Sequence, residues 1–252
     1  MFGTLARHWP EYLMEAAGLA FFVTSASVVT TLLEYPGSPV HRAIGSTFGR
    51  HVVLGIGMGL VVAAIVYSPW GKRSGAHINP AVTWAFFRLG RIRGWDATFY
   101  TVAQFGGAAG AVQLMGVVIG TPYRHPLVDH VVTKPGPAGP VAAFAAEFVI
   151  SFVLMLVVAF AVSSERLEKL TGLFAGVLIA VYLMFETPLS GMSLNPARTF
   201  GSALAARHWT ALWLYFVAPT TAMLLAAELS LWLGGDARAR RGPAYPVVPP
   251  TS

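Results

Sequence analysis

Long apolar segments dominate the chain, and six of them reach the length that a helix needs to cross a bilayer. Their approximate limits are 10–33, 51–69, 95–120, 140–163, 170–187 and 209–233. About 20 apolar residues in a helix span the hydrocarbon core of a membrane. Turn-forming stretches such as YPGSP at 35–39 and KPGPAGP at 134–140 separate the segments. The pattern predicts an all-α membrane protein with six transmembrane helices.

Two further apolar segments, 79–88 and 195–205, are too short to span a bilayer. Each begins at Asn-Pro and follows a loop that contains glycine, in SGAHINPAV at 74–82 and GMSLNPARTF at 191–200. Short apolar segments beside membrane spans are typical of re-entrant half-helices. Irregular backbone at membrane depth is tolerated only where it is buried in protein or lines a watery cavity. The sequence therefore predicts two half-helices and a cavity between them.

The two parts of the chain, about 10–120 and 140–233, repeat the order span, span, half-helix, span. Glu15 in the first span corresponds to Glu147 in the fourth. Because each part has an odd number of spans, the second part enters the membrane from the opposite side, which makes an inverted repeat. We therefore predict one channel domain over 1–252. The Pro-rich segment 234–252 is expected to be a disordered cytoplasmic tail.

Composition and charge placement support a membrane protein and exclude a nucleic-acid partner. The chain is 55% hydrophobic and 11% charged, whereas soluble domains carry about 25% charged residues. The net charge of +6 does not indicate nucleic-acid binding, because the charges lie at the ends of apolar segments and form no single basic stripe. With both termini inside, eleven Lys and Arg residues lie on the inner side and five on the outer side. The positive-inside rule favours this orientation, with cytoplasmic termini.

The residue types exclude most catalytic chemistry. The chain has no cysteine, so a thiolate, a disulfide or a Cys-metal site cannot form. The histidines are scattered over loops and segment ends, and the sequence contains neither His-x-x-x-His nor a carboxylate pair. We therefore expect that the protein has no metal site and no cofactor and is not an enzyme. An ion-coupled transporter also combines inverted repeats with broken helices. That alternative would normally place carbonyls or carboxylates at the membrane midplane, and its flux would depend on a proton or sodium gradient.

The repeated motifs carry the chemistry that we expect at the midplane. They are Asn79, Pro80 and Ala81 in the first loop and Asn195, Pro196 and Ala197 in the second. Asn is a preferred helix N-cap and Pro is favoured at the first helical position, so both motifs start helices. In an inverted repeat the two starts face each other, and the small alanines allow close approach. Two positive dipole ends repel cations while the Asn amides donate to a passing oxygen, which favours small neutral molecules.

Both loops resemble the signature loops of the aquaporin, or major intrinsic protein, family, and the resemblance covers residues 10–233. It implies an aquaporin-like right-handed bundle, one pore per subunit, a homotetramer and, with the brevity of the chain, a bacterial inner membrane. Glycerol-type members carry Asp where this chain has Thr199, and Tyr215-Phe216 is similar to water channels. We therefore expect a passive channel for water that excludes protons and ions. A facilitator of glycerol or another small neutral solute is the alternative.

The resemblance also implies an outer constriction, formed by Arg198, Leu183, Met192 and either Gly59 or, if the loop SPWGKR at 68–73 carries one extra residue, Met58. Leu183 stands where water-selective members commonly have His. The outer constriction would then consist of Arg198 and largely apolar side chains. The absence of the His found in water-selective members weakens the expectation of strict water selectivity. An arginine at membrane depth is costly and is normally functional.

Two interpretations apply to Glu15 and Glu147. They could relay protons, or they could accept hydrogen bonds from the irregular backbone of the loops, with His77 nearby, and the resemblance favours the second role. The small-xxx-small glycine pairs predict close helix crossings; they are Gly55 with Gly59, Gly106 with Gly110, and Gly172 with Gly176.

Overall fold

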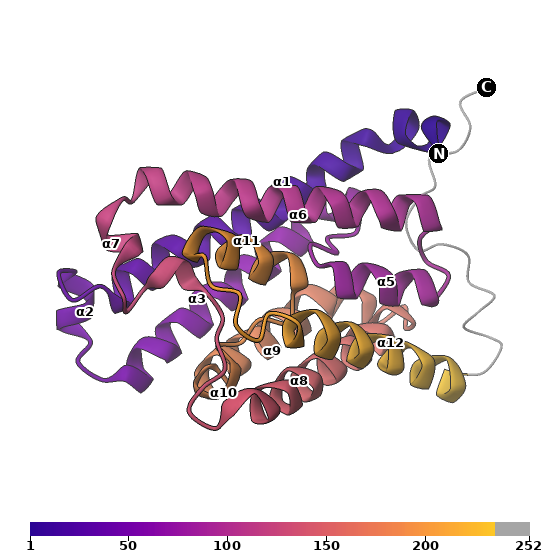
Figure 1. Cartoon of the computed structure of the whole chain (residues 1–252). Helices are drawn as coiled ribbons and strands as arrows, with labels where there is room; N and C mark the ends of the chain where they lie inside the picture. The colour runs from indigo at the N-terminus through magenta and orange to yellow at the C-terminus, as the bar shows by residue number, and fades with distance from the viewer. Residues whose placement is uncertain (235–252) are drawn as a thin grey trace.

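A computed structural model of the protein describes residues 1–234, and the secondary structure in that range is entirely helical (Figure 1). Six of the described helices are long and apolar enough to cross a membrane. These are α1 (Phe2–Glu34), α3 (Thr47–Tyr67), α6 (Gly94–Val118), α8 (Gly139–Val162), α9 (Thr171–Phe185) and α12 (Leu214–Gly234). The prediction of six spans is confirmed.

Two helix boundaries differ clearly from the sequence-based limits. Helix α1 begins at Phe2 and not near residue 10, whereas α12 begins at Leu214 and not at 209. The later start of α12 follows from Ala211, whose φ angle of 55° is left-handed and interrupts the predicted span, whereas Arg207, with φ of 54°, caps the end of α11. Of the expected disordered tail, only Gly234 is described, and 235–252 lie outside the described residues.

Two half-helices complete the predicted repeat. Helix α5 (Pro80–Arg88) follows α3, and α11 (Pro196–Ala206) follows α9. Each contacts both α6 and α12, so they lie among the long helices (Figure 1). The remaining described helices are connectors: α2 (Pro39–Ala43), α4 (Pro69–Ser74), α7 (Thr121–Arg124) and α10 (Thr187–Ser190), with the 3₁₀ turns η1 (Asp129–Val131) and η2 (Glu168–Leu170). Helices α4 and α10 lead into the two re-entrant loops.

Glycines bring α3 and α9 into backbone contact. A Cβ atom added to Gly59 would lie 2.5 Å from the carbonyl oxygen of Gly176, and one added to Gly55 would lie 2.5 Å from that of Ala180. Only glycine fits such a crossing. The expectation for Gly106 and Gly110 is wrong, because neither has a neighbour within 4 Å of an added Cβ. Gly107 makes that close approach instead, with 2.3 Å between its added Cβ and the carbonyl oxygen of Ala16 on α1.

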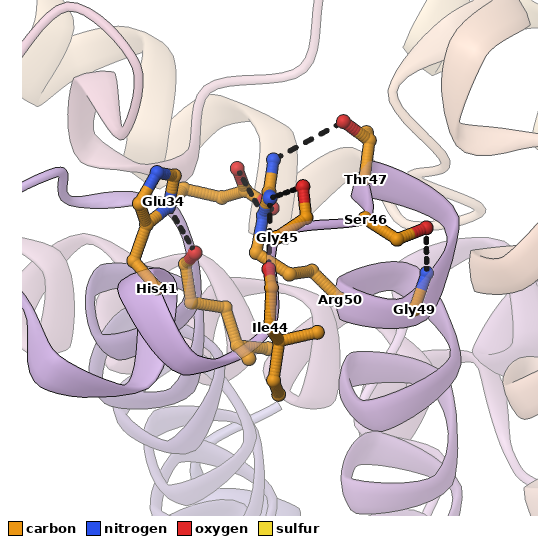
Figure 2. A network of polar contacts seen from close by, with 9 residues as sticks. Glu34, His41, Ile44, Gly45, Ser46, Thr47, Gly49 and Arg50 are labelled. Atoms are coloured by element: carbon orange, nitrogen blue, oxygen red, sulfur yellow. Dashed lines mark hydrogen bonds and ion pairs between the residues drawn. The ribbon is translucent and has the colours of Figure 1, made fainter.

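A buried arginine organises the connection from α1 to α3. Figure 2 shows Arg50 between the carboxylate of Glu34 and the chain preceding α3. Its Nε donates to both oxygens of Glu34, at 3.1 and 3.2 Å, and its Nη1 donates to the carbonyl of Ile44 at 3.1 Å. Its Nη2 reaches the hydroxyl of Thr47. The guanidinium therefore uses its fork of donors to tie the end of α1 to the start of α3.

Candidate functional site

The two re-entrant loops have the same backbone conformation. Gly75, Ala76 and Ile78 have φ angles of 96°, 48° and 42°. The corresponding residues of the second loop repeat the pattern, with Gly191 at 80°, Met192 at 50° and Leu194 at 59°. A left-handed conformation is unfavourable for residues other than glycine, by about 1–3 kcal/mol each. Each loop must therefore be held by strong interactions with its surroundings.

Glu15 supplies these interactions in the first loop. Its Oε1 accepts hydrogen bonds from the hydroxyl of Ser74 at 2.8 Å and the N–H of His77 at 3.0 Å. Its Oε2 accepts from the N–H of Ile78 at 2.5 Å and the amide of Gln104 at 2.8 Å. The Glu15 side chain is fully buried. A carboxylate accepts several donors at once, which suits a loop whose N–H groups have no secondary-structure partners.

Glu147 has the matching role in the second loop. Its Oε1 accepts from the hydroxyl of Ser190 at 2.6 Å and the N–H of Ser193 at 2.7 Å, and its Oε2 from the N–H of Leu194 at 2.8 Å. It too is fully buried. The geometry favours loop support over a proton relay for this glutamate pair, because both carboxylates accept hydrogen bonds from the loops.

The sequence reasoning missed five residues that complete these supports, and Gln104 is one of them. Ser74 and Ser190 bond the glutamates, and the hydroxyls of Tyr100 and Tyr215 donate to the carbonyls of Ser74 and Ser190 at 2.6 and 2.5 Å. A signal for the serines was present, since both loops read Ser-Gly-x-x-x-Asn-Pro-Ala. Tyr100 and Tyr215 follow Asn79 and Asn195 by nearly equal numbers of residues, which is a weaker signal that they have equivalent roles.

His77, expected near the loop support, contributes its backbone N–H to Glu15. Its ring stacks on Phe86, with 4.7 Å between ring centroids, and its Nδ1 lies 3.2 Å from the hydroxyl of Thr83. That hydroxyl donates to the carbonyl of Asn79, so Nδ1 carries a proton and donates to Thr83.

The two asparagines cap their half-helices and also bind each other's loops. The Oδ1 of Asn79 accepts from the N–H of Ala81 at 2.9 Å, and that of Asn195 from Ala197 at 3.0 Å. Each Nδ2 then crosses over: Asn79 donates to the carbonyl of Leu194 and Asn195 to that of Ile78, both at 2.8 Å. An amide has two N–H donors, so each asparagine retains one after this reciprocal bond. Pro80 and Pro196 occupy the first position of each helix.

A cavity of about 440 Å³ reaches these asparagines from the side of α4 and η2, where Lys72 and Lys169 line it. Its apolar wall includes Val62, Leu154 and Ile179. Its polar wall comes from the two loops, and both Asn79 and Asn195 line it. The cavity therefore combines an apolar surface with a file of backbone and amide groups, and it ends where the two helix starts meet.

The residues expected at the outer constriction do not line this cavity. Met58, Leu183 and Met192 are buried in one apolar cluster. Gly59 instead faces the backbone of α9, so the geometry favours Met58 as the residue from the second span. The Nη1 of Arg198 is buried and has no hydrogen-bond partner within the described chain. An unpartnered guanidinium donor at membrane depth is a group that a passing oxygen could satisfy.

Comparisons with known proteins agree with this geometry. The sequence profile described as Major intrinsic protein matches residues 4–229. Aquaporin NIP1-2 of Oryza sativa subsp. japonica is 40% identical over 171 residues, 67% of this chain and 56% of the rice protein. Aquaporin NIP2-1 of the same organism is 35% identical over 227 residues, 88% of this chain and 72% of that protein. The alignment to NIP1-2 thus spans just over half of that relative.

A solved structure shares the fold. The aquaglyceroporin from Plasmodium falciparum superposes with a TM-score of 0.73 over 88% of this chain and 95% of that chain, at 19% sequence identity. The named sequence relatives are plant proteins, and they give no support to the expected bacterial inner membrane. The family match and the aligned relatives establish an integral membrane protein, and the family that they share consists of channels and not of enzymes. The chain belongs to the major intrinsic protein, or aquaporin, family.

Proposed function

We propose that the protein is a passive channel for water that excludes protons and ions. The observation that carries this proposal is the reciprocal bonding of Asn79 and Asn195, which fixes two helix N-termini tip to tip at the end of the cavity. Each tip presents the positive end of a helix dipole, so a cation meets repulsion there. A water oxygen that accepts from both asparagines must point its hydrogens outward, which interrupts a proton wire.

The apolar walls support rapid passage. A file of water needs donors and acceptors on one side only, and Val62, Leu154 and Ile179 offer none on the other side. Arg198 adds a fixed positive charge beyond the asparagines, which strengthens the exclusion of cations. The predicted orientation would place the cavity on the cytoplasmic side, together with both termini, and the expected assembly is a homotetramer.

A second candidate is a facilitator of glycerol or another small neutral solute. The observation that favours it is the apolar character of Met58, Leu183 and Met192, which give a solute's carbon atoms a surface opposite the Arg198 donors. Thioether side chains are flexible and adapt to different shapes. The family relatives named aquaporins and the fold neighbour named an aquaglyceroporin are compatible with either solute class.

Stopped-flow light scattering of proteoliposomes distinguishes the two. We expect shrinkage in an impermeant osmolyte to be fast and weakly temperature-dependent relative to empty liposomes, with little re-swelling when glycerol is the osmolyte. Glycerol permeability comparable to that of water would favour the second candidate. Shrinkage no faster than that of empty liposomes would reject the water channel.

A further inference from the structure

Hydroxyl groups form a directed chain beside the second Asn-Pro-Ala motif. Thr133 contacts the hydroxyl of Thr199 at 2.9 Å, Thr199 contacts the hydroxyl of Ser193, and Ser193 donates to the carbonyl of Asn195 at 3.1 Å. Each hydroxyl has a single proton. Since Ser193 gives its proton to Asn195, Thr199 must donate to Ser193 and Thr133 must donate to Thr199. We call these three residues the outer hydroxyl chain.

The first loop has an equivalent chain with a different donor. Thr83, four residues after Asn79 as Thr199 is four after Asn195, donates to the carbonyl of Asn79 at 3.0 Å. Its hydroxyl accepts from the amide of Gln104 on α6 at 3.1 Å. In both halves, therefore, a side chain from outside the loop bonds the threonine on the first turn of the half-helix.

The repeat explains why the second half needs another donor. Gln104 lies one helical turn after Tyr100, and the corresponding position one turn after Tyr215 is Pro219. Proline offers no side-chain donor. Thr133, from the connection between α7 and α8, supplies the bond that α12 cannot, and it is 3% exposed.

The backbone around Thr133 is fixed independently of its hydroxyl. The N–H of Gly136 donates to the carbonyl of Leu189 at 2.8 Å, and a Cβ added to Gly136 would lie 1.9 Å from the carbonyl oxygen of Pro188. Lys134 forms an ion pair with Asp129 within the same connection. Removing one hydroxyl should therefore leave this connection packed against the second loop.

Arg198 lies between the two residues that the chain restrains. Its N–H donates to the Oδ1 of Asn195 at 3.2 Å, and Thr199 follows it directly. We propose that Thr133 is a positioning residue for the outer constriction: by donating to Thr199 it fixes the turn that carries Arg198 and so sets the ratio of small-solute to water permeability. This inference rests on the proposed channel function.

The test compares Thr133→Val, which keeps the shape and loses the hydroxyl, with Thr133→Ser, which keeps the hydroxyl. Thr221→Val is the matched control, because the Thr221 hydroxyl is exposed and bonds only carbonyls of its own helix. Water and glycerol permeabilities are measured on proteoliposomes with equal amounts of folded channel. A net hydrogen bond corresponds to about 1 kcal/mol, so we expect the glycerol-to-water ratio of Thr133→Val to rise about threefold to tenfold. Thr133→Ser and Thr221→Val should stay within about twofold of the unmodified protein, since neither loses this bond.

The outcomes separate the two proposals. Unmodified protein that conducts neither water nor glycerol rejects the channel function itself. Conducting protein whose ratio is unchanged or lower in Thr133→Val, or raised equally in Thr133→Ser, overturns the role of Thr133. Thr133→Ala provides a second hydroxyl-free variant without added bulk. If both hydroxyl-free variants fail to fold while Thr133→Ser folds, the hydroxyl serves folding and not selectivity, and the proposal is equally overturned.

Discussion

Replacing Glu147 with alanine should destabilise the channel far more than it changes what the channel conducts. The carboxylate accepts the N–H groups of Ser193 and Leu194 and the hydroxyl of Ser190. It is fully buried and does not line the inner cavity. A proton relay would need exchange with water, whereas a support needs only to remain in place.

The magnitude follows from the bonds that are lost. In the alanine variant two buried backbone N–H groups lose their acceptor, while the Ser190 hydroxyl can rotate. A buried unsatisfied donor costs about 1–3 kcal/mol, so the variant should lose about 2–6 kcal/mol. Folded domains are stable by only about 5–15 kcal/mol, and a loss of this size would lower the folded yield sharply. Glu147→Gln keeps one acceptor oxygen, so its folded yield should lie between those of the unmodified protein and of Glu147→Ala.

The assay is the yield of monodisperse protein in detergent, its thermal unfolding, and permeability normalised to folded protein. Glu228→Ala is the control, because Glu228 is an exposed carboxylate paired with Arg88. Exposed pairs contribute about 0–1 kcal/mol, so this variant should behave like the unmodified protein. Normal yield of Glu147→Ala together with altered selectivity or proton flux would refute the support role and favour a relay.

Three further predictions concern other parts of the molecule. Burial, reinforced by the carboxylate of Glu147, raises the pKa of Glu186 from 4.5 to about 8, and the nearby donors of Ser190 and Met192 offset this increase only in part. The folded protein then retains a proton that the unfolded chain releases, so stability should fall as the pH rises from 4.5 to about 8, by at most about 1.4 kcal/mol per pH unit. Thermal unfolding of Glu186→Gln should lack this decline, and an equal decline in the variant would contradict the assignment. Gly59→Val should abolish the folded yield, because its Cβ would lie 2.5 Å from a backbone oxygen of α9. Gly57→Ala is the control and should fold, because the space around its Cβ is open. A folded Gly59→Val protein would disprove the close crossing of α3 and α9. Mercuric ion should leave water flux unchanged, since the chain has no cysteine, and block that thiols reverse would count against this.

Much of the fold could be predicted because membrane insertion imposes simple rules on sequence. Length and hydropathy located the six spans, and the Asn-Pro starts located both half-helices, since capping chemistry is local. The ends of α1 and α12 were less well predicted. A left-handed residue such as Ala211 carries no distinctive side-chain signal, so the sequence did not predict the turn before α12.

The loop supports show where sequence reasoning stops. Ser74 and Ser190 recur at the same place in both motifs and could have been found by aligning them. Thr133 could not, because its role arises where the repeat fails: Pro219 replaces the donor that Gln104 provides in the first half. The choice between Met58 and Gly59 likewise depended on which side of α3 faces α9; the close approach of Gly59 to Gly176 favours Met58, which stays a prediction.

The most direct test of the charge-excluding pore measures water and proton flux in the same proteoliposomes, with light scattering for shrinkage and an enclosed pH-sensitive dye for protons. Opposed helix tips capped by Asn79 and Asn195 predict osmotic shrinkage much faster than in empty liposomes, while a pH gradient decays at the background rate. Proton flux that rises in step with water flux would contradict the account.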